Sequence, residues 1–263
     1  MEFELLGRHS RLVKEIRSLS SHSERLEKGL FVVEGIRVIE ELIASKVRIM
    51  HLLLAERLLN SDVTVWAEEV KAQQSGVKIW IAADSVMEDI SSTKSDQGIL
   101  AVAEMPQVGS KDILRNDKLL VLSQVQDPGN VGTLIRSALA FGFQAVLACG
   151  GADPFNARAV RSSAGAVFHL PVLHCGDDEL EEWCQRLVKE EFALITAEAH
   201  GGLSINKVKF PKRMALVLGA EVKGVDRSWQ NEAHIKVHIP LEAKSESLNV
   251  AAAGAIIMFK TTC

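Results

Sequence analysis

The stretch "DPGNVGTLIRSALAFG", Asp127–Gly142, follows the apolar run "KLLVLSQV" at Lys118–Val125. Its first residues favour a tight turn, and the apolar residues after them recur at helical spacing. The sequence therefore predicts a strand, a turn and a helix, the order in which many α/β proteins present a ligand or a reactive group. An asparagine in the turn, Asn130, and an arginine two turns into the helix, Arg136, raise the question of what they contact.

The composition indicates a soluble globular protein with one large domain or two ordinary ones. Of the 263 residues, 47% are apolar and 24% are charged,. No apolar run reaches the roughly 18 residues that span a bilayer, so we expect no membrane partner,. The N-terminal residues lack the apolar segment and cleavage site of a secretory signal,. We expect a cytoplasmic protein, or an organellar one if a transit peptide has been removed.

Cysteine and histidine spacing argues against a metal site. The four cysteines contain no CxxC pair, and the eight histidines form no HExxH or comparable set,. We therefore expect no bound metal and reduced, mostly buried thiols. The cysteines are Cys149, Cys175, Cys184 and Cys263.

The net charge of −4 argues weakly against a non-specific nucleic-acid binder, a class that is usually basic,. Two segments are locally basic: Arg8–Lys28 contains six cations, and "KVKFPKR" at Lys207–Arg213 contains four. For either segment taken alone, a solvated face is the more ordinary interpretation. The net charge nevertheless does not exclude an enzyme that acts on RNA, because local basic patches matter more than the total.

The first hundred residues alternate between helical and strand patterns, which predicts one compact α/β unit over residues 1–105,. Residues 106–117, "PQVGSKDILRND", mix proline, glycine and charge and suit a linker,. The predicted helices of this unit are 9–19, 36–45, 62–74 and 84–90, and its predicted strands are 29–35, 47–55, 77–82 and 97–105.

Residues 118–263 form the second predicted domain. Its strands are near-continuous apolar runs separated by helices, which indicates a parallel sheet buried on both faces. The predicted strands are 118–125, 143–150, 167–173, 192–199, 213–221 and 233–241. The predicted helices are 130–141, 157–164, 177–190, 226–232 and about 247–259.

Three strand ends of this domain carry unusual residues: "DPGNVG", "VLGAEVKG" at Val217–Gly224 and "IPLEAKSESLNV" at Ile239–Val250. Ligands bind outside the carboxyl ends of parallel strands. None of the three is a GxGxxG or a P-loop, which disfavours a dinucleotide-dependent oxidoreductase,.

Each of these residues also has an ordinary structural interpretation. Gly219 can be a turn glycine or allow a ligand close to the backbone. Ser247 can cap the last helix, and Asn249 can cap locally or bind a ligand. Glu221 can be a solvated carboxylate or a polar clamp. Arg136 can form a surface ion pair or contact a phosphate, which its planar fork matches.

Taken together and in this order, the three segments resemble the three motifs of the SpoU branch of the SPOUT RNA methyltransferases. The matching residues are "NVGTLIRSALAFG" (Asn130–Gly142), "LVLGAEVKGV" (Leu216–Val225) and "IPLEAKSESLNVAAAGAI" (Ile239–Ile256). The stretch "FVVEGIRVIEELI" (Phe31–Ile43) resembles the L30e-like RNA-binding domain that often precedes this catalytic domain. Two positions depart from the common pattern: Ala243 stands where many members have glycine, and Ala220 where asparagine or serine is common.

The resemblance implies an α/β domain with a deep C-terminal trefoil knot, a rare exception to unknotted chains. It also implies S-adenosylmethionine as the cofactor and a homodimer with composite sites. The cofactor-binding residues that it implies are Thr196, Leu218, Gly219, Ile239, Leu241, Ser247 and Leu248.

The implied reaction is methyl transfer to a ribose 2′-OH of RNA. Arg136 would contact the phosphate beside the target ribose, Asn130 would position the target or cross the dimer interface, and Glu221 and Asn249 would orient the site. Ribosomal RNA is the substrate that we favour, because of the L30e-like domain. A transfer-RNA enzyme and a non-catalytic RNA-binding or ribosome-assembly factor of the same fold are the alternatives.

Overall fold

The structure is a computed structural model that describes residues 4–59, 62–74, 76–93, 97–242 and 247–262. Contacts within the chain divide it into two compact units. The first extends to Gln107 and also contains Phe155–Phe168, and the second comprises Val108–Pro154 and the chain from His169 onward. No helix in the described ranges combines the length and apolarity that crossing a membrane requires.

The first unit is built on a mixed five-stranded sheet of order β1-β4-β3-β5-β2. Strands β1, β4 and β3 are mutually parallel, and β5 runs antiparallel to both β3 and β2. The strands are β1 (Glu4–Leu6), β2 (Leu30–Glu34), β3 (Ile49–Ala55), β4 (Lys78–Ala82) and β5 (Ile99–Glu104). The α-helices of this unit are α1 (Arg11–Ser18), α2 (His22–Lys28), α3 (Ile36–Ala44), α4 (Asp62–Gln73), α5 (Asp84–Ile90) and α8 (Ala157–Ser162).

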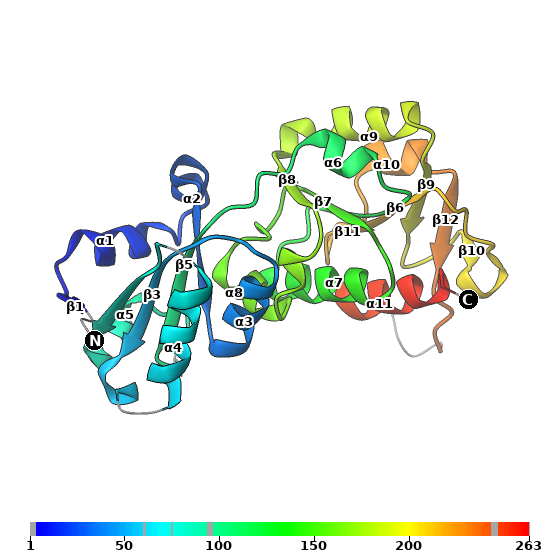
Figure 1. Cartoon of the computed structure of the whole chain (residues 1–263). Coiled ribbons are helices and arrows are strands. Elements are labelled where there is room, and N and C mark those ends of the chain that lie inside the picture. The colour runs from blue at the N-terminus through cyan, green and yellow to red at the C-terminus, as the bar shows by residue number, and fades with distance from the viewer. Residues whose placement is uncertain (1–3, 60–61, 75, 94–96, 243–246, 263) are drawn as a thin grey trace. The chain divides into compact units, whose positions relative to one another are not determined.

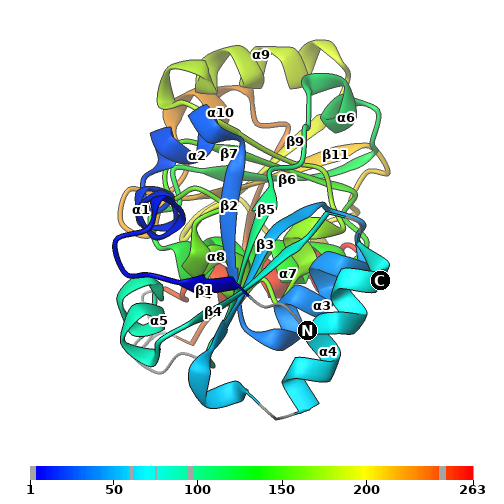
Figure 2. The ribbon, with the colours of Figure 1, turned by 60° about the vertical axis from the view of Figure 1, so that its left-hand side comes forward.

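Helices cover both faces of this sheet, with α1 and α5 on one face and α3 and α4 on the other (Figure 2). Helix α1 begins where the Ser10 hydroxyl accepts a hydrogen bond from the Val13 amide,. It then buries Leu12, Val13 and Ile16 against the sheet, since these residues share one helical face,. The alternating pattern of the first hundred residues thus yields the α/β fold that it predicted.

The segment Phe155–Phe168 belongs to the first unit because of its aromatic contacts. The ring of Phe31 on β2 lies edge-on to Phe155 at 5.3 Å and tilted to Phe168 at 5.8 Å, measured between ring centroids. Aromatic pairs of this kind stabilise the fold beyond what the burial of the three rings contributes. The sequence alone places this segment with the second domain, since nothing local reveals that its partners lie in β2.

The second unit contains a seven-stranded sheet of order β10-β12-β9-β11-β6-β7-β8. Every pairing in it is parallel, as the near-continuous apolar runs predicted,. The strands are β6 (Lys118–Ser123), β7 (Ala145–Cys149), β8 (Val172–Cys175), β9 (Ala193–Ala197), β10 (Leu203–Ser204), β11 (Met214–Gly219) and β12 (Ile235–His238).

Helices α6, α9 and α10 lie on one face of this sheet, and α7 and α11 lie on the other (Figure 1). Trp183, Leu187 and Trp229 anchor the first layer in the core. The central strands β6 and β11 are almost wholly buried between the two layers. The helices are α6 (Ser110–Leu114), α7 (Pro128–Ala140), α9 (Leu180–Lys189), α10 (Arg227–Glu232) and α11 (Val250–Lys260).

Five local features differ from the sequence predictions. Helix α2 and the short strands β1 and β10 were not predicted, and α6 lies inside the segment predicted as a linker. The predicted strand 167–173 is a single turn of 3₁₀ helix at Ala166–Phe168 followed by β8. Val167 and Phe168 are buried all the same, so an apolar run without clear periodicity was mistaken for a strand,.

The three described cysteines are free and buried, as expected from the sequence. A hydrogen bond with Cys175 and burial together raise the pKa of the Cys149 thiol well above its ordinary value. Burial raises the pKa of Cys184 to about 12. These thiols are therefore protonated core residues, and a thiolate nucleophile is not expected among them. Cys263 lies outside the described residues.

Candidate active site

The carboxyl end of β11 forms the floor of the site. Gly219, its last residue, pairs with Ser123 at the end of β6. The following loop closes on itself, because Ala220 N donates to Gly224 O at 3.0 Å and Gly224 N donates to Ala220 O at 2.9 Å. A Cβ at Gly219 would overlap the backbone of Gly224 and Val225. Glycine is thus required here by the tight return of the loop.

The N-terminus of α11 forms a second wall. The Asn249 side chain caps this helix, since its Oδ1 accepts from the amides of Ala251 at 2.9 Å and Ala252 at 3.3 Å,. Of the two caps that the sequence allowed, Asn249 is the one observed, and Ser247 lies two residues earlier in the chain. At Gly254 a Cβ would overlap Leu134 of α7 and Leu218 of β11. This close approach brings the α11 N-terminus beside the end of β11.

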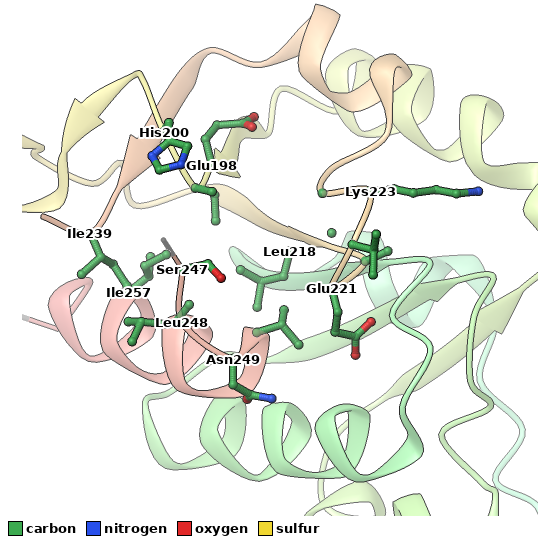
Figure 3. A pocket seen from close by; sticks show the side chains of 18 of the residues that line it. Glu198, His200, Leu218, Glu221, Lys223, Ile239, Ser247, Leu248, Asn249 and Ile257 are labelled. Atoms are coloured by element: carbon green, nitrogen blue, oxygen red, sulfur yellow. The ribbon is translucent and has the colours of Figure 1, made fainter. Parts of the chain in front are cut away.

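Between these walls lies a cavity of about 650 Å³, a size typical of small-ligand sites,. Figure 3 shows Leu218, Ser247 and Leu248 around its centre, with Glu198 and His200 on the side opposite Asn249. Six of the seven predicted cofactor-binding residues line it: Leu218, Gly219, Ile239, Leu241, Ser247 and Leu248.

The seventh, Thr196, does not line the cavity. It lies inside β9, wholly buried between Val217 of β11 and Lys236 of β12. Its hydroxyl oxygen has no hydrogen-bond partner among the described residues. The residues that follow Thr196 along the chain line the cavity in its place.

The residues at and after the end of β9 were not predicted from the sequence to line the cavity. Ala197, Glu198, Ala199 and His200 all line the cavity. One carboxylate oxygen of Glu198, Oε1, is buried and has no hydrogen-bond partner in the described part of the chain. An unsatisfied buried acceptor beside a cavity suits a ligand that donates a hydrogen bond. The available signal was that residues 192–199 predict a parallel strand, whose end joins the other strand ends at one edge.

A second, polar hollow adjoins the cavity. The two share Ala220, Glu221, Val222, Lys223 and Asn249 as lining residues. The polar hollow is lined in addition by Gln124, Gln126, Asp127, Asn130 and Asp177. Amides and carboxylates dominate these walls, whereas leucine and isoleucine side chains line much of the first cavity.

Three of the four predicted catalytic residues form one hydrogen-bonded chain along this boundary. Asn249 Nδ2 donates to Asn130 Oδ1 at 3.1 Å, and Asn130 Nδ2 donates to Glu221 Oε1 at 2.8 Å. The segments that carry them are 91 and 119 residues apart from Asn130 in sequence. We call this set the Asn249–Asn130–Glu221 chain. It ties the N-terminal ends of α7 and α11 to the loop after β11.

Glu221 is held as a carboxylate within this chain. Partial burial raises the pKa of Glu221. Hydrogen bonds from the Asn130 side chain and from backbone amides, including those of Gln126 and Asp127, together lower it by more,. The net result is a pKa below the ordinary value of 4.5. The carboxylate is therefore ionised at neutral pH and orients Asn130.

Arg136, the fourth predicted catalytic residue, stands apart from the other three. It is exposed on α7 and lines neither the cavity nor the polar hollow. Its guanidinium has no ion pair or hydrogen bond with any described residue. Of the two atypical positions, Ala220 lines both hollows. Ala243 lies outside the described residues.

The two basic segments are partly occupied by structural contacts. Arg25 is buried and donates to the carbonyls of Leu19 at 2.7 Å and Ser20 at 3.0 Å. Arg17 pairs with Asp89, and Lys28 pairs with Glu24 at 2.7 Å. In the first segment this leaves Arg8, Arg11 and Lys14 as exposed cations. In the second, Arg213 stacks on the Phe192 ring at 4.0 Å, and Lys207, Lys209 and Lys212 are exposed.

Among known protein families, residues 117–259 match the SpoU rRNA Methylase family. That range includes both hollows and all eleven predicted site residues. The chain belongs to the SpoU rRNA Methylase family. Residues 11–101 match a second family, the MRM3-like substrate binding domain.

Relatives of this SpoU chain resemble it over nearly its whole length. A 23S rRNA (guanosine(2553)-2′-O)-methyltransferase of Bacillus subtilis is 30% identical over 94% of this chain and 94% of its own. A 23S rRNA (uridine(2479)-2′-O)-methyltransferase of Streptomyces viridochromogenes is 28% identical over 97% of this chain and 90% of its own. The crystal structure of an AdoMet-bound rRNA methyltransferase from Sinorhizobium meliloti is 25% identical, with a TM-score of 0.84, and covers 98% of this chain and 97% of its own.

Proposed function

We propose that this SpoU family member transfers the methyl group of S-adenosylmethionine to a ribose 2′-OH of ribosomal RNA. The observation that carries this proposal is the pair of adjoining hollows with five shared lining residues. One is suited to an amphipathic cofactor, and the other is lined by polar side chains that can form hydrogen bonds with a nucleotide. A methyl donor and its acceptor can thus meet across the Asn249–Asn130–Glu221 chain.

The relatives support the cofactor and the substrate class. The Bacillus and Streptomyces relatives are named as 23S rRNA 2′-O-methyltransferases, and the Sinorhizobium structure as AdoMet-bound. The match to a substrate binding domain at residues 11–101 supports an RNA partner for the first unit.

The cavity residues fit S-adenosylmethionine. Leu218, Ile239 and Leu248 provide an apolar wall for the adenine ring,. The unsatisfied Glu198 Oε1 offers an acceptor for an amino or hydroxyl group of the cofactor,. Two carboxylates in the lining, Glu198 and Glu221, also favour a cation,. When bound, the cofactor would supply a methyl group on its positively charged sulfur; transfer to the ribose oxygen would leave the neutral thioether and release the hydroxyl proton to water.

The protein's own side chains then act by orientation. The Asn249–Asn130–Glu221 chain holds Asn130 in one position at the edge of the polar hollow, where the target ribose would lie. A guanidinium is a poor proton acceptor at neutral pH, so we assign Arg136 to binding the phosphate beside that ribose. Holding the hydroxyl in line with the methyl group, in a favourable field, supplies most of the acceleration.

We also propose a homodimer, paired through α7 and α11. These helices pack on each other and leave Leu139, Ile256 and Phe259 exposed by 38%, 40% and 55%. An apolar face of this kind marks an interaction surface. Because Arg136 lies on α7 and lines neither hollow of its own chain, pairing would let it serve the partner's site,. We also propose that the C-terminal domain contains the trefoil knot that the resemblance implies.

The decisive experiment supplies methyl-labelled S-adenosylmethionine with separate pools of ribosomal and transfer RNA from methylation-deficient cells. Mapping of 2′-O-methyl groups is expected to give a single position in ribosomal RNA. Label in transfer RNA alone would favour the transfer-RNA alternative. Absence of label in both pools would overturn the enzymatic proposal in favour of a non-catalytic RNA-binding factor. Calorimetry with S-adenosylmethionine tests the cofactor site independently.

A further inference from the structure

The polar hollow has a wall that the proposed chemistry does not use. Gln124, directly after β6, and Asp177, two residues after β8, line it. Gln124 has a left-handed backbone, with φ of 58°, a conformation that glycine adopts at little cost and glutamine rarely adopts,. Non-glycine residues held this way occur at functional sites, where the surrounding structure enforces them.

Backbone hydrogen bonds at the ends of three adjacent strands enforce this conformation. Gln124 N donates to Cys149 O at 2.9 Å, joining the ends of β6 and β7. Gly150 N donates to Cys175 O at 2.9 Å, joining the ends of β7 and β8. Ala152 N donates to Val125 O at 2.8 Å, which links the segments that follow β7 and β6. The wall is therefore a rigid platform at the sheet edge.

The two side chains are fixed on this platform by each other. Gln124 Nε2 donates to Asp177 Oδ1 at 3.0 Å. Asp177 packs directly over Gly150, where a Cβ would overlap its carboxylate. The glycine leaves the space that Asp177 occupies, and the glutamine amide then orients the carboxylate. Two groups so held present a defined set of hydrogen-bonding atoms to the hollow.

Most of the hydrogen-bonding atoms left for a ligand are acceptors. Asp177 Oδ2 and Gln124 Oε1 have no hydrogen-bond partner among the described residues, and Asp177 Oδ1 keeps a second lone pair beside the bond from Gln124, which uses one of the two N–H donors of Gln124 Nε2,. A carboxylate accepts two parallel donors most strongly. It also disfavours a phosphate at this wall. The wall therefore suits the base of the target nucleotide, read on its edge as unstacked RNA bases are.

Guanine is the base that matches these acceptors. Its Watson–Crick edge presents two adjacent donors, N1–H and the 2-amino group, to one carboxylate. Adenine and cytosine each present one amino group beside a ring acceptor, and uracil presents one N–H between two acceptors. Each of these three would place an acceptor against the Asp177 carboxylate, an arrangement that costs free energy.

We propose that Asp177, oriented by Gln124, recognises the Watson–Crick edge of a guanine and makes guanosine the methylated nucleotide. This inference rests on the proposed methyltransferase function and adds the specificity of the same site. Gln124 acts through Asp177 and is a positioning residue, and Asp177 is the residue that contacts the base.

The test uses the full-length protein and the ribosomal RNA fragment that the wild type methylates, synthesised with guanosine or inosine at the methylated position. Inosine lacks only the 2-amino group. For the wild type we expect kcat/KM at least about tenfold higher with guanosine, the loss expected for one hydrogen bond to a charged acceptor. Asp177→Ala is expected to lower kcat/KM for guanosine by about tenfold or more and to bring the two substrates within about twofold.

Further variants separate recognition from support of the fold. Asp177→Asn keeps the size of the side chain and should also lose the preference for guanosine. Gln124→Gly keeps the left-handed backbone and should weaken the preference in part. Asp178→Asn changes the neighbouring exposed carboxylate, which does not line the hollow, and should leave the preference intact. A purely structural role of Asp177 would lower the rates with both substrates equally and leave their ratio unchanged.

The failures of the two proposals are distinguishable. A wild type that methylates no RNA would remove the proposed function, and this inference with it. A wild type that methylates ribosomal RNA at a nucleotide other than guanosine would overturn this inference alone. An unchanged guanosine-to-inosine ratio in Asp177→Ala would do the same.

Discussion

At the scale of single residues, the site depends on side chains that hold one another. In the Asn249–Asn130–Glu221 chain, Asn249 uses its oxygen to cap α11 and its amino group to bind Asn130. Asn130 in turn donates a hydrogen bond from its side-chain amide nitrogen to Glu221. Apart from the local cap of α11, these contacts join segments far apart in the sequence, so a change at one residue leaves its neighbours unpaired,.

Replacing Asn130 should therefore cost more than one contact. In Asn130→Ala the Glu221 carboxylate loses its side-chain donor, and the Asn249 amino group loses its acceptor. We expect methyl transfer to fall at least about tenfold, with a coupling free energy of about 1 to 3 kcal/mol between Asn130 and Glu221 in a double-mutant cycle of the transfer rate. Additive effects in that cycle would contradict the hydrogen-bonded chain.

Arg136 should matter for transfer and little for cofactor binding. Arg136→Ala is expected to keep the calorimetric Kd for S-adenosylmethionine within a few-fold, because Arg136 does not line the cavity. Transfer should fall at least about a hundredfold, roughly 2.7 kcal/mol of barrier. Arg227→Ala, which removes another exposed arginine, is the matched control. Undiminished turnover in Arg136→Ala would rule out the assigned role.

His51 gives the first unit a dependence on pH. Burial lowers its pKa below the ordinary 6.5, and Trp80 Nε1 donates to its Nδ1 at 3.1 Å, which requires that nitrogen to be unprotonated. Below about pH 6.5 the unfolded chain takes up a proton that the folded chain does not, so stability is present above this pH and declines as pH falls towards the folded-state pKa. Denaturant unfolding at pH 7.5 and about pH 5.5 should show this loss reduced in His51→Gln and unchanged in His9→Gln, an exposed control,. An equal loss in both variants would refute the assignment.

At the scale of elements, the site exists because α11 lies unusually close to β11 and α7. The approach occurs at Gly254, which contacts Leu134 and Leu218 where a side chain would otherwise stand. Leu218 also lines the cofactor cavity. The packing of one helix thus sets the shape of the cavity wall.

Gly254→Ala tests this coupling, because helix propensity predicts a gain in stability and packing predicts a loss. Propensity alone would stabilise α11 by about 1 kcal/mol. The added methyl group overlaps two leucine side chains, and overpacking of this kind costs about 1 to 3 kcal/mol,. We expect packing to prevail, with a lower Tm and a higher Kd for S-adenosylmethionine. Ala255→Gly, on the same helix, should lower Tm without changing the Kd. A stabilised Gly254→Ala protein would show that α11 tolerates the added methyl group.

At the scale of the whole molecule, the proposed enzyme combines a SpoU unit with a substrate-binding unit and pairs two chains. The match to a substrate binding domain covers residues 11–101, and the SpoU match covers 117–259. In the proposed dimer each active site would take its cavity from one chain and Arg136 from the other. The function would then belong to the assembly rather than to the single chain.

Mixing two defective variants tests this composite site. Arg136→Ala removes the residue that a chain contributes to its partner's active site. Glu221→Ala removes a residue of the chain's own active site. If subunits exchange freely, half of the dimers are mixed and each has one of its two sites intact, so about a quarter of wild-type transfer should return. Phe259→Asp, on the exposed face of α11, should lower both dimer content by sedimentation and transfer rate. No recovery on mixing, despite exchange, would place Arg136 in its own chain's site.

The sequence by itself determined the local elements and the family. Periodicity located the helices and the buried strands, because side-chain spacing reports which faces are apolar. The motif residues Asn130, Gly219, Glu221 and Asn249 could be singled out because they interrupt this pattern at strand and helix ends. The family match at residues 117–259 agrees with the resemblance that these motifs carry.

Only the tertiary structure decided which of these residues meet. Strand order placed the end of β9 between β11 and β12, so Glu198 lines the cavity while Thr196 is buried. It also brought β8 beside β7, so that Asp177 reaches Gln124 across 53 residues of sequence. Sheet order and long-range packing arise from contacts between distant segments, which no local spacing encodes.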